Sequence, residues 1–169
     1  MTVAPGIIRA DWKEQLKGLL PLFGHRNWIV VADSAYPAQS RPGIETIVSG
    51  AGQIEVARRV LDSIAGSEHV RANVYLDREL QFVPEPDAPG ISRYRKQLAE
   101  LIKSAQTTSL PHEQIIAKLD QSAQTFRVLI IKTEMTIPYT SIFFELDCAY
   151  WSAEAEQRLR ALMDASDSK

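Results

Sequence analysis

This chain has little cysteine and no surplus of basic residues, and each of these features argues against a class of protein. Cys148 is the only cysteine among 169 residues, so neither an intrachain disulfide nor a cysteine-based metal site can form. The formal net charge is −2, with 19 Lys and Arg against 21 Asp and Glu. Nucleic-acid-binding proteins normally carry a basic surplus. The composition therefore argues against a nucleic-acid partner, and the cysteine usage suits a reducing cytosol.

Long hydrophobic runs and cofactor-binding motifs are missing as well. No apolar run approaches the roughly 20 residues that span a bilayer, and the first residues lack the basic-then-apolar pattern of a signal peptide. The three histidines, His25, His69 and His112, show no H-E-x-x-H spacing, and no glycine-rich nucleotide-binding motif follows a predicted strand. We therefore expect a cytoplasmic protein that uses no membrane, metal ion or other cofactor. His69 is expected to be a solvated loop residue.

What remains is the composition of one ordinary globular domain. Hydrophobic residues make up 45% and charged residues 24% of the chain, which is typical of a domain with a sizeable core. Apolar runs predict strands, and amphipathic segments between them predict helices. Strands are expected at residues 28–32, 44–48, 70–76, 128–131 and 141–146, and helices at residues 11–20, 53–64, 92–104, 112–123 and 152–165. This alternation indicates a single α/β domain, residues 1–169, with a mainly parallel sheet.

One stretch, residues 24–37, combines a predicted buried strand with two titratable side chains. A Gly-His pair precedes the apolar run from Trp28 to Ala32, and Asp33 ends that run. An imidazole and a carboxylate that frame a buried strand are suited to proton transfer. A plainer interpretation is also open: a core strand that begins beside a solvated His25 and ends at a capping Asp33.

Two later segments add to this pattern. Residues 137–143 (I-P-Y-T-S-I-F) follow an apolar strand, and residues 110–114 (L-P-H-E-Q) lie between the two regions. Together the three segments resemble the D-ribose pyranase/L-fucose mutarotase family, whose members carry a Gly-His start, an I-V-x-A-D-A-x-x-P strand and a late P-Y-x-N-I segment. The resemblance extends over roughly residues 10–145. It implies a three-layer α/β/α domain and a ring-shaped homo-oligomer, with the helix at residues 152–165 as an addition to the family core.

The resemblance implies a sugar mutarotase or pyranase, an isomerase that interconverts the cyclic forms of a ribose- or fucose-like monosaccharide. Ring opening needs one group that removes the anomeric hydroxyl proton and another that protonates the ring oxygen, and neither needs a cofactor. The family's proton-donating histidine matches His25, whose imidazole can exchange protons near neutral pH. The family's aspartate matches Asp33, which is expected to accept hydrogen bonds from sugar hydroxyls.

Four further residues are expected to bind the sugar. His112 stands in the first turn of a predicted helix, where the helix dipole favours a neutral ring that can both donate and accept. Tyr139 offers a hydroxyl and a flat apolar face, and Thr140 and Ser141 offer backbone or hydroxyl contacts. Judged without the resemblance, His112 could equally be a surface residue at a helix start, and Tyr139 an aromatic on a half-buried strand.

Three departures from the family pattern leave a second function open. Asn27 replaces the acid of G-H-x-D, Ser141 replaces the late asparagine, and Ile116 stands where the ribose type has a lysine. These changes favour a non-catalytic monosaccharide-binding or regulatory protein of the same fold. Distance adds a constraint, because the eight residues from His25 to Asp33 could span more than about 20 Å as a strand. We therefore expect sites that combine residues of neighbouring subunits.

Overall fold

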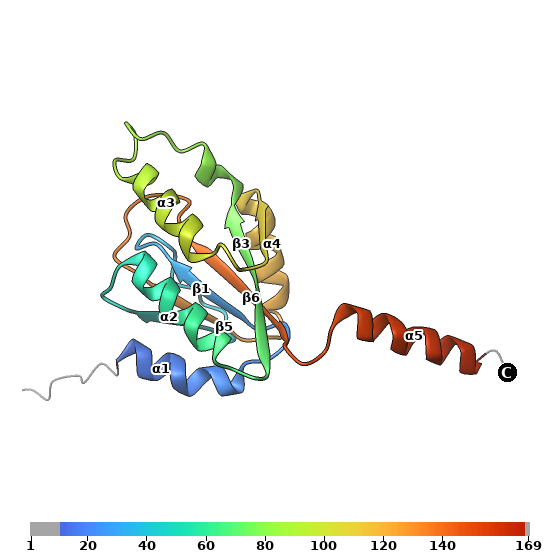
Figure 1. Cartoon of the computed structure of the whole chain (residues 1–169). Helices are drawn as coiled ribbons and strands as arrows, with labels where there is room; N and C mark the ends of the chain where they lie inside the picture. The colour runs from blue at the N-terminus through green and yellow to red at the C-terminus, as the bar shows by residue number, and fades with distance from the viewer. Residues whose placement is uncertain (1–10, 168–169) are drawn as a thin grey trace, which may run out of the picture.

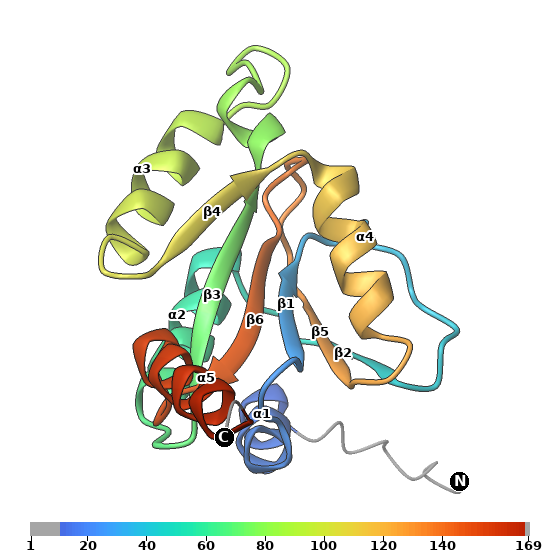
Figure 2. The same cartoon turned by 90° about the vertical axis from the view of Figure 1, so that its right-hand side faces the viewer.

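A six-stranded mixed sheet forms the centre of the protein. The computed structural model (Figure 1) describes residues 11–167, and its strands stand in the order β2-β5-β1-β6-β3-β4 (Figure 2). β6 runs antiparallel to its neighbours β1 and β3, whereas the other three pairs are parallel. This confirms the predicted α/β class with a mainly parallel sheet. The strands are β1 (Trp28–Ala32), β2 (Ile44–Val48), β3 (Val70–Asp77), β4 (Thr107–Leu110), β5 (Val128–Lys132) and β6 (Ile142–Cys148).

Helices cover both faces of the sheet and make a three-layer domain (Figure 2). β1 is buried along its whole length, and successive side chains of a strand point to opposite faces. Ile29 and Val31 therefore pack with the three helices of one face, and Trp28 and Val30 pack with the helix of the other face. The first face carries α1 (Trp12–Leu19), α2 (Gln53–Ala65) and α3 (Ile91–Leu101), and the second carries α4 (His112–Ser122). The expected α/β/α arrangement is confirmed.

Two local features differ from the sequence expectations. β4 escaped prediction because Thr107–Leu110 is a short, polar edge strand whose side chains are mostly exposed, so no apolar run marks it. His69 lies in the loop before β3 as expected, but it is half-buried and not solvated. Its Nε2 lies 3.0 Å from the carbonyl oxygen of Phe23 and 3.3 Å from that of Leu20, and the ring ties the start of β3 to the short 3₁₀ helix η1 (Leu20–Leu22).

The C-terminal helix stands apart from the three layers. α5 (Ala153–Asp167) buries none of its side chains and points away from the sheet (Figure 1). The Ser152 hydroxyl accepts a hydrogen bond from the Ala155 N–H and caps the helix as the sequence indicated. Within the described residues 11–167, none of the helices combines the length and the apolar character needed to cross a membrane. The cytoplasmic location stays a prediction.

Candidate functional site

A cavity of about 590 Å³ opens at the end of the sheet where β1 and β3 finish. In α/β folds, the carboxyl ends of the strands are the usual place for ligands. Asp33 follows β1, Asp77 is the last residue of β3, and His112 begins α4; all three line the cavity. The remaining wall comes from the loop that follows β1, from further residues of α4, and from residues 136–139, which precede β6. The cavity therefore gathers polar side chains from two strand ends and one helix start.

Asp33 is held in place from two sides. Its Oδ1 accepts a hydrogen bond of 3.0 Å from the Ala35 N–H, the turn expected of an aspartate that ends a strand. Its Oδ2 accepts a hydrogen bond of 3.1 Å from the Ser141 hydroxyl, and that hydroxyl in turn accepts from the Asp33 N–H at 3.3 Å. Asp33 is half-buried, so its carboxylate is both oriented and reachable from the cavity.

His112 pairs with a buried aspartate. Its Nδ1 lies 3.0 Å from Oδ1 of Asp77, whose side chain is 1% exposed, whereas the imidazole itself is 30% exposed. Burial raises the pKa of Asp77, and the hydrogen bond with His112 offsets only part of this rise. The backbone N–H of His112 donates to the carboxylate of Glu79, which stands in the short 3₁₀ helix η2 (Arg78–Gln81) and caps α4.

Tyr139 lies beside this imidazole in an unusual backbone conformation. The rings of Tyr139 and His112 meet edge to face with centroids 5.9 Å apart. The φ angle of Tyr139 is 58°, in the left-handed region, which a bulky residue occupies only where its surroundings enforce it. Its side chain remains substantially exposed and borders the cavity. The loop thus presents the tyrosine to the ligand space at a cost in backbone energy.

A buried polar network holds this loop from beneath. The carbonyl oxygen of Thr140 accepts hydrogen bonds from Gln53 Nε2 at 2.7 Å and from the Tyr94 hydroxyl at 2.6 Å. Gln53 Nε2 also donates to the Val31 carbonyl in β1. The Thr140 hydroxyl donates to the carbonyl of Ile137. Thr140 is fully buried and its polar groups are committed within the chain, so it supports the loop where the sequence suggested a direct sugar contact.

Ser141 is also placed differently from the sequence expectation. It is buried, and its hydroxyl is engaged with Asp33 as described above. Neither Thr140 nor Ser141 is among the residues that line the cavity. Three of the expected sugar-binding residues therefore border the cavity, Asp33, His112 and Tyr139, while two lie behind them.

The charge around the cavity is negative. Four acidic side chains line it, and the described residues of the lining include no Lys or Arg: Asp33, Asp77, Glu113 and Asp120. Burial, followed by the charges of Asp120 and Asp77, raises the pKa of Tyr36 in the same wall, which keeps its hydroxyl protonated. Residues 11–167 contain no cluster of three or more His, Cys, Asp or Glu arranged to hold a metal ion. Such a wall suits a ligand that donates hydrogen bonds and carries no negative charge.

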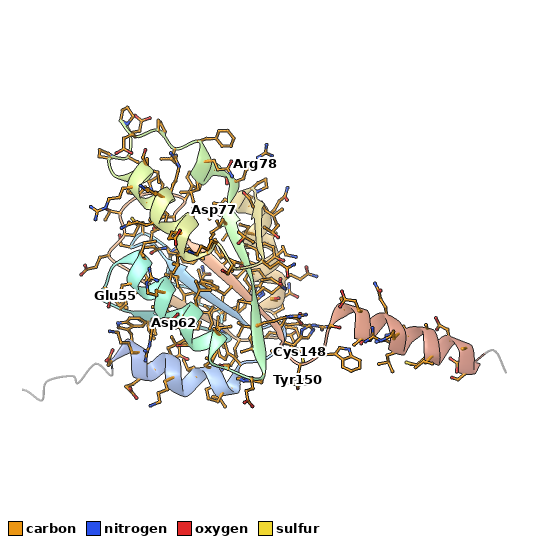
Figure 3. The ribbon with its side chains drawn as sticks, in the orientation of Figure 1. Glu55, Asp62, Asp77, Arg78, Cys148 and Tyr150 are labelled. Atoms are coloured by element: carbon orange, nitrogen blue, oxygen red, sulfur yellow. The ribbon has the colours of Figure 1, made fainter. Side chains whose placement is uncertain are left out.

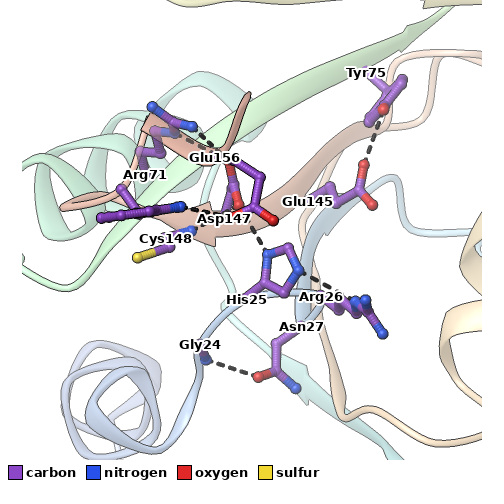
Figure 4. Close-up of polar contacts among 11 residues, drawn as sticks. Gly24, His25, Arg26, Asn27, Arg71, Tyr75, Glu145, Asp147, Cys148 and Glu156 are labelled. Atoms are coloured by element: carbon purple, nitrogen blue, oxygen red, sulfur yellow. Dashed lines mark hydrogen bonds and ion pairs between the residues drawn. The ribbon is translucent and has the colours of Figure 1, made fainter. Parts of the chain in front are cut away.

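His25 lies in a different place (Figure 4). It borders a second cavity, of about 670 Å³, together with Arg71, Asp147 and Cys148. Its Nδ1 is 2.8 Å from Asp147 Oδ1, and its Nε2 accepts a hydrogen bond of 3.2 Å from the guanidinium of the following residue. The five residues of β1 alone separate the two cavities by roughly 15 Å. One chain therefore does not bring His25 and Asp33 to the same ligand.

The departure at Asn27 has a structural explanation. Asn27 Oδ1 accepts a hydrogen bond of 2.7 Å from the Gly24 N–H (Figure 4). Its amide nitrogen donates to the Arg127 carbonyl. An acceptor oxygen at this position closes the turn that carries His25, and an amide supplies it as well as a carboxylate does. This substitution accordingly leaves the geometry around His25 intact.

Asp77 is the main site residue that the sequence did not single out. Asp77 follows a predicted apolar strand just as Asp33 does. This shared position at a strand end could have identified it as a candidate site residue. Figure 3 shows Asp77 at the upper end of the sheet, far from Cys148 and Tyr150, where the chain leaves for α5. The two cavities thus occupy opposite ends of the molecule.

Comparisons with known proteins agree on one family. Residues 10–148 match the RbsD / FucU transport protein family. RbsD from Bacillus subtilis complexed with D-ribose has a TM-score of 0.56 at 19% identity, covering 86% of this chain and 98% of that one. A fucose mutarotase from Streptococcus pneumoniae in complex with L-fucose has a TM-score of 0.52 at 21% identity, covering 79% of this chain and 91% of that one. FucU from Bifidobacterium longum has a TM-score of 0.53 at 18% identity, covering 79% of this chain and 94% of that one. No curated protein matches the chain.

Proposed function

Because the chain belongs to the RbsD/FucU family, we propose that it is an isomerase that interconverts the cyclic forms of a monosaccharide without a cofactor. One observation carries the proposal: Asp33, His112 and Tyr139, which match the family pattern, line a single cavity of about 590 Å³. They come from three separate segments of the chain, so their meeting is a property of the fold. Small-molecule sites typically have volumes of this order. The relatives bound to D-ribose and L-fucose support a sugar as the ligand.

Ring opening transfers two protons and breaks one bond. A base takes the proton of the anomeric hydroxyl, and the electron pair of that O–H bond forms the carbonyl. The bond from C1 to the ring oxygen breaks, and the ring oxygen keeps its electron pair and takes a proton from an acid. After rotation about C1–C2, the reverse steps close the ring on the other face, and attack by another hydroxyl changes the ring size. A positioned acid or base contributes roughly 10²–10⁴-fold to such steps.

His112 supplies one of the two proton-transfer groups, because its imidazole is partly exposed and borders the cavity. Asp33 accepts hydrogen bonds from sugar hydroxyls, and Tyr139 contributes its hydroxyl and ring face. The second proton-transfer group is His25 of another copy of the chain. The family resemblance supports this role for His25, and the separation of the two cavities requires that it come from another copy. The active protein is then a homo-oligomer, which we expect to be a ring.

The substrate is an uncharged sugar. The acidic lining repels phosphate and carboxylate groups, whereas several carboxylate oxygens can accept the hydroxyl protons of a polyol. Ile116 lines the cavity where the ribose type has a lysine, so no ammonium group is available at this position. Its side chain offers an apolar contact for the C–H face of a sugar.

Saturation-transfer NMR on a panel of equilibrated sugars, including ribose and fucose, tests the proposal. The wild type is expected to accelerate exchange between anomeric or ring forms, and His112→Asn and His25→Ala to abolish most of the acceleration. Glu100→Gln is the control, because Glu100 is exposed on α3 and pairs only with Lys103. Ligand broadening without faster exchange would indicate a sugar-binding protein, and no response from any sugar would refute both functions.

A further inference from the structure

His112 could hydrogen-bond a sugar without a buried carboxylate behind it, yet its imidazole is paired with the buried Asp77. We propose that Asp77 is a positioning residue that holds the Nδ1–H of His112, so that Nε2 faces the cavity as the atom that exchanges a proton with the sugar. This inference rests on the proposed isomerase function and assigns His112 an acid–base role in place of the hydrogen-bonding role that the sequence suggested.

The geometry of the pair supports the assignment. Nδ1 of His112 lies 3.0 Å from Oδ1 of Asp77, within the normal range for a charge-assisted hydrogen bond. The Asp77 side chain is 1% exposed and the imidazole 30% exposed, so the carboxylate lies beneath the ring and one part of the ring faces the ligand space. A neutral imidazole has one N–H, and a carboxylate on Nδ1 fixes that proton there.

Structural stability does not account for Asp77. Its second oxygen, Oδ2, is buried and has no hydrogen-bond partner among the described residues. The charges of Glu79 and Asp33 lie close enough to oppose its ionisation. A buried carboxylate with a single hydrogen bond destabilises a fold compared with an apolar residue of the same size. Nor is Asp77 needed as a helix cap, because Glu79 already accepts the His112 N–H.

The pair is suited to moving a proton in both directions. With Nδ1 occupied, the Nε2 lone pair can take the proton of the anomeric hydroxyl, and the resulting imidazolium is stabilised by the adjacent carboxylate. Returning that proton from Nε2 to a sugar oxygen restores the neutral ring. Burial raises the pKa of Asp77, and the hydrogen bond with His112 offsets part of this rise, so the imidazole is the group that favours the ionised form of this carboxylate.

The tautomer of His112 is the first test and needs no sugar. In ¹⁵N-histidine-labelled protein, long-range ¹H–¹⁵N spectra separate the Nδ1–H from the Nε2–H tautomer, and loss of one set of signals in His112→Asn assigns them. The wild type is expected to show Nδ1–H. Asp77→Asn is expected to switch His112 to Nε2–H, because an amide N–H would then donate to Nδ1. An Nε2–H tautomer in the wild type would overturn the proposal.

Sugar exchange kinetics are the second test. Asp77→Asn is expected to lower kcat by about 10²–10⁴-fold with KM within about threefold, since the wrong tautomer removes the acceptor at Nε2. The matched control is Glu145→Gln, which removes a carboxylate hydrogen-bonded to the Tyr75 hydroxyl at 2.9 Å and lies outside the cavity lining. Its kcat and its His112 tautomer are expected to match the wild type.

The two proposals fail in different ways. An Asp77→Asn variant that keeps its rate, in a protein whose wild type accelerates sugar exchange, would refute the role of Asp77 and leave the isomerase function standing. A wild type that accelerates the exchange of no sugar would refute the isomerase function, and with it the transfer of a proton between His112 and a sugar. In that case the tautomer spectra would still decide whether Asp77 holds the imidazole.

Discussion

The Ser141 hydroxyl and the Asp33 carboxylate bind each other at the edge of the cavity, although 108 residues separate them in the chain. Ser141 Oγ donates to Asp33 Oδ2 and accepts from the Asp33 N–H, while the Ala35 N–H holds Oδ1. Both carboxylate oxygens are thereby fixed before a ligand arrives. Such preorganisation lowers the entropic cost of binding.

Removal of this hydroxyl should weaken sugar binding more than catalysis. We expect Ser141→Ala to raise KM by about tenfold, because a lost hydrogen bond of this kind is worth about 1–1.5 kcal/mol, and to change kcat by less than about threefold. Steady-state exchange rates measured by NMR at varied sugar concentration check this. Ser63→Ala is the control, since the Ser63 hydroxyl donates to the Arg59 carbonyl on the exposed side of α2. An unchanged KM would show that Asp33 does not depend on Ser141.

The Tyr94 hydroxyl should contribute to folding stability through the loop before β6. It donates to the Thr140 carbonyl at 2.6 Å in a buried setting. We expect Tyr94→Phe to lower the free energy of unfolding by about 1 kcal/mol, because Gln53 still satisfies that carbonyl. Urea denaturation followed by circular dichroism measures the change. Gln53→Leu, which leaves the Val31 and Thr140 carbonyls without this donor, is expected to cost more than Tyr94→Phe, and the reverse order would contradict the network.

The stability contributed by Asp147 should depend on pH. Partial burial opposes its ionisation, but hydrogen bonds from Arg71, the Cys148 N–H and His25 outweigh this and hold its pKa below the usual value. A lowered pKa in the folded state stabilises the fold above the unfolded-state value, near 3.9, and this stability is lost as pH falls through the folded-state value. Asp147→Asn should thus be less stable than wild type at pH 7, by at most about 1 kcal/mol.

Thermal unfolding between pH 2.5 and 7 checks this prediction. The difference in melting temperature between wild type and Asp147→Asn is expected to shrink steadily below pH 4. Asp62→Asn, at an exposed position on α2, serves as the control. A difference that stays constant across this range would mean that the ionisation of Asp147 is not linked to folding.

A site shared between copies of the chain predicts complementation between inactive variants. His25→Ala and His112→Asn should each lose most activity as pure proteins. In co-assembled oligomers, random mixing at equal amounts should restore about a quarter of the wild-type activity, because one site in four then pairs an intact His112 with an intact His25. Activity is measured on co-expressed, doubly tagged protein. No recovery in mixed oligomers would place both histidines' roles within one chain.

The acidic lining predicts discrimination against anionic sugars. A sugar phosphate should bind at least about tenfold more weakly than the parent sugar, because its charge meets Asp33, Asp77, Glu113 and Asp120 without a basic partner in the lining. Ligand-observed NMR titrations with ribose and ribose 5-phosphate compare the two. In Ile116→Lys, which adds an ammonium group to the wall, the difference should narrow; equal affinities in the wild type would refute the electrostatic argument.

Local patterns in the sequence predicted most of the architecture. The apolar run of β1 and the amphipathic pattern of α4 each lie within one continuous segment of the sequence. The sequence therefore predicted both elements and their approximate bounds. β4 did not, because a polar edge strand is defined by its hydrogen bonds to β3 and not by its own composition. Periodicity reveals which face of an element is buried, so a short strand whose side chains are mostly exposed leaves no apolar pattern.

The site was only partly predictable for the same reason. Asp33, His112 and Tyr139 were named from motifs, but the partners that orient them lie far away in sequence. Gln53 bonds to carbonyls 22 and 87 residues away, and Asp77 bonds to an imidazole 35 residues away. These contacts depend on strand order and loop path, which a single sequence does not display. The separation of His25 from Asp33 was predictable, because it depends only on the length of the strand between them, and the structure places the two residues at different cavities.

The anchoring of the loop before β6 has a consequence for how this protein can change over evolutionary time. The loop is held through Thr140 by groups beneath it and through Ile137, which packs against the core, while the exposed Thr136 and Pro138 border the cavity and make none of those anchoring bonds with their side chains. Substitutions at Thr136 and Pro138 can therefore alter the shape of the ligand space without disturbing the anchor or the sheet. The fold separates the part that must be conserved from the part that is free to diversify.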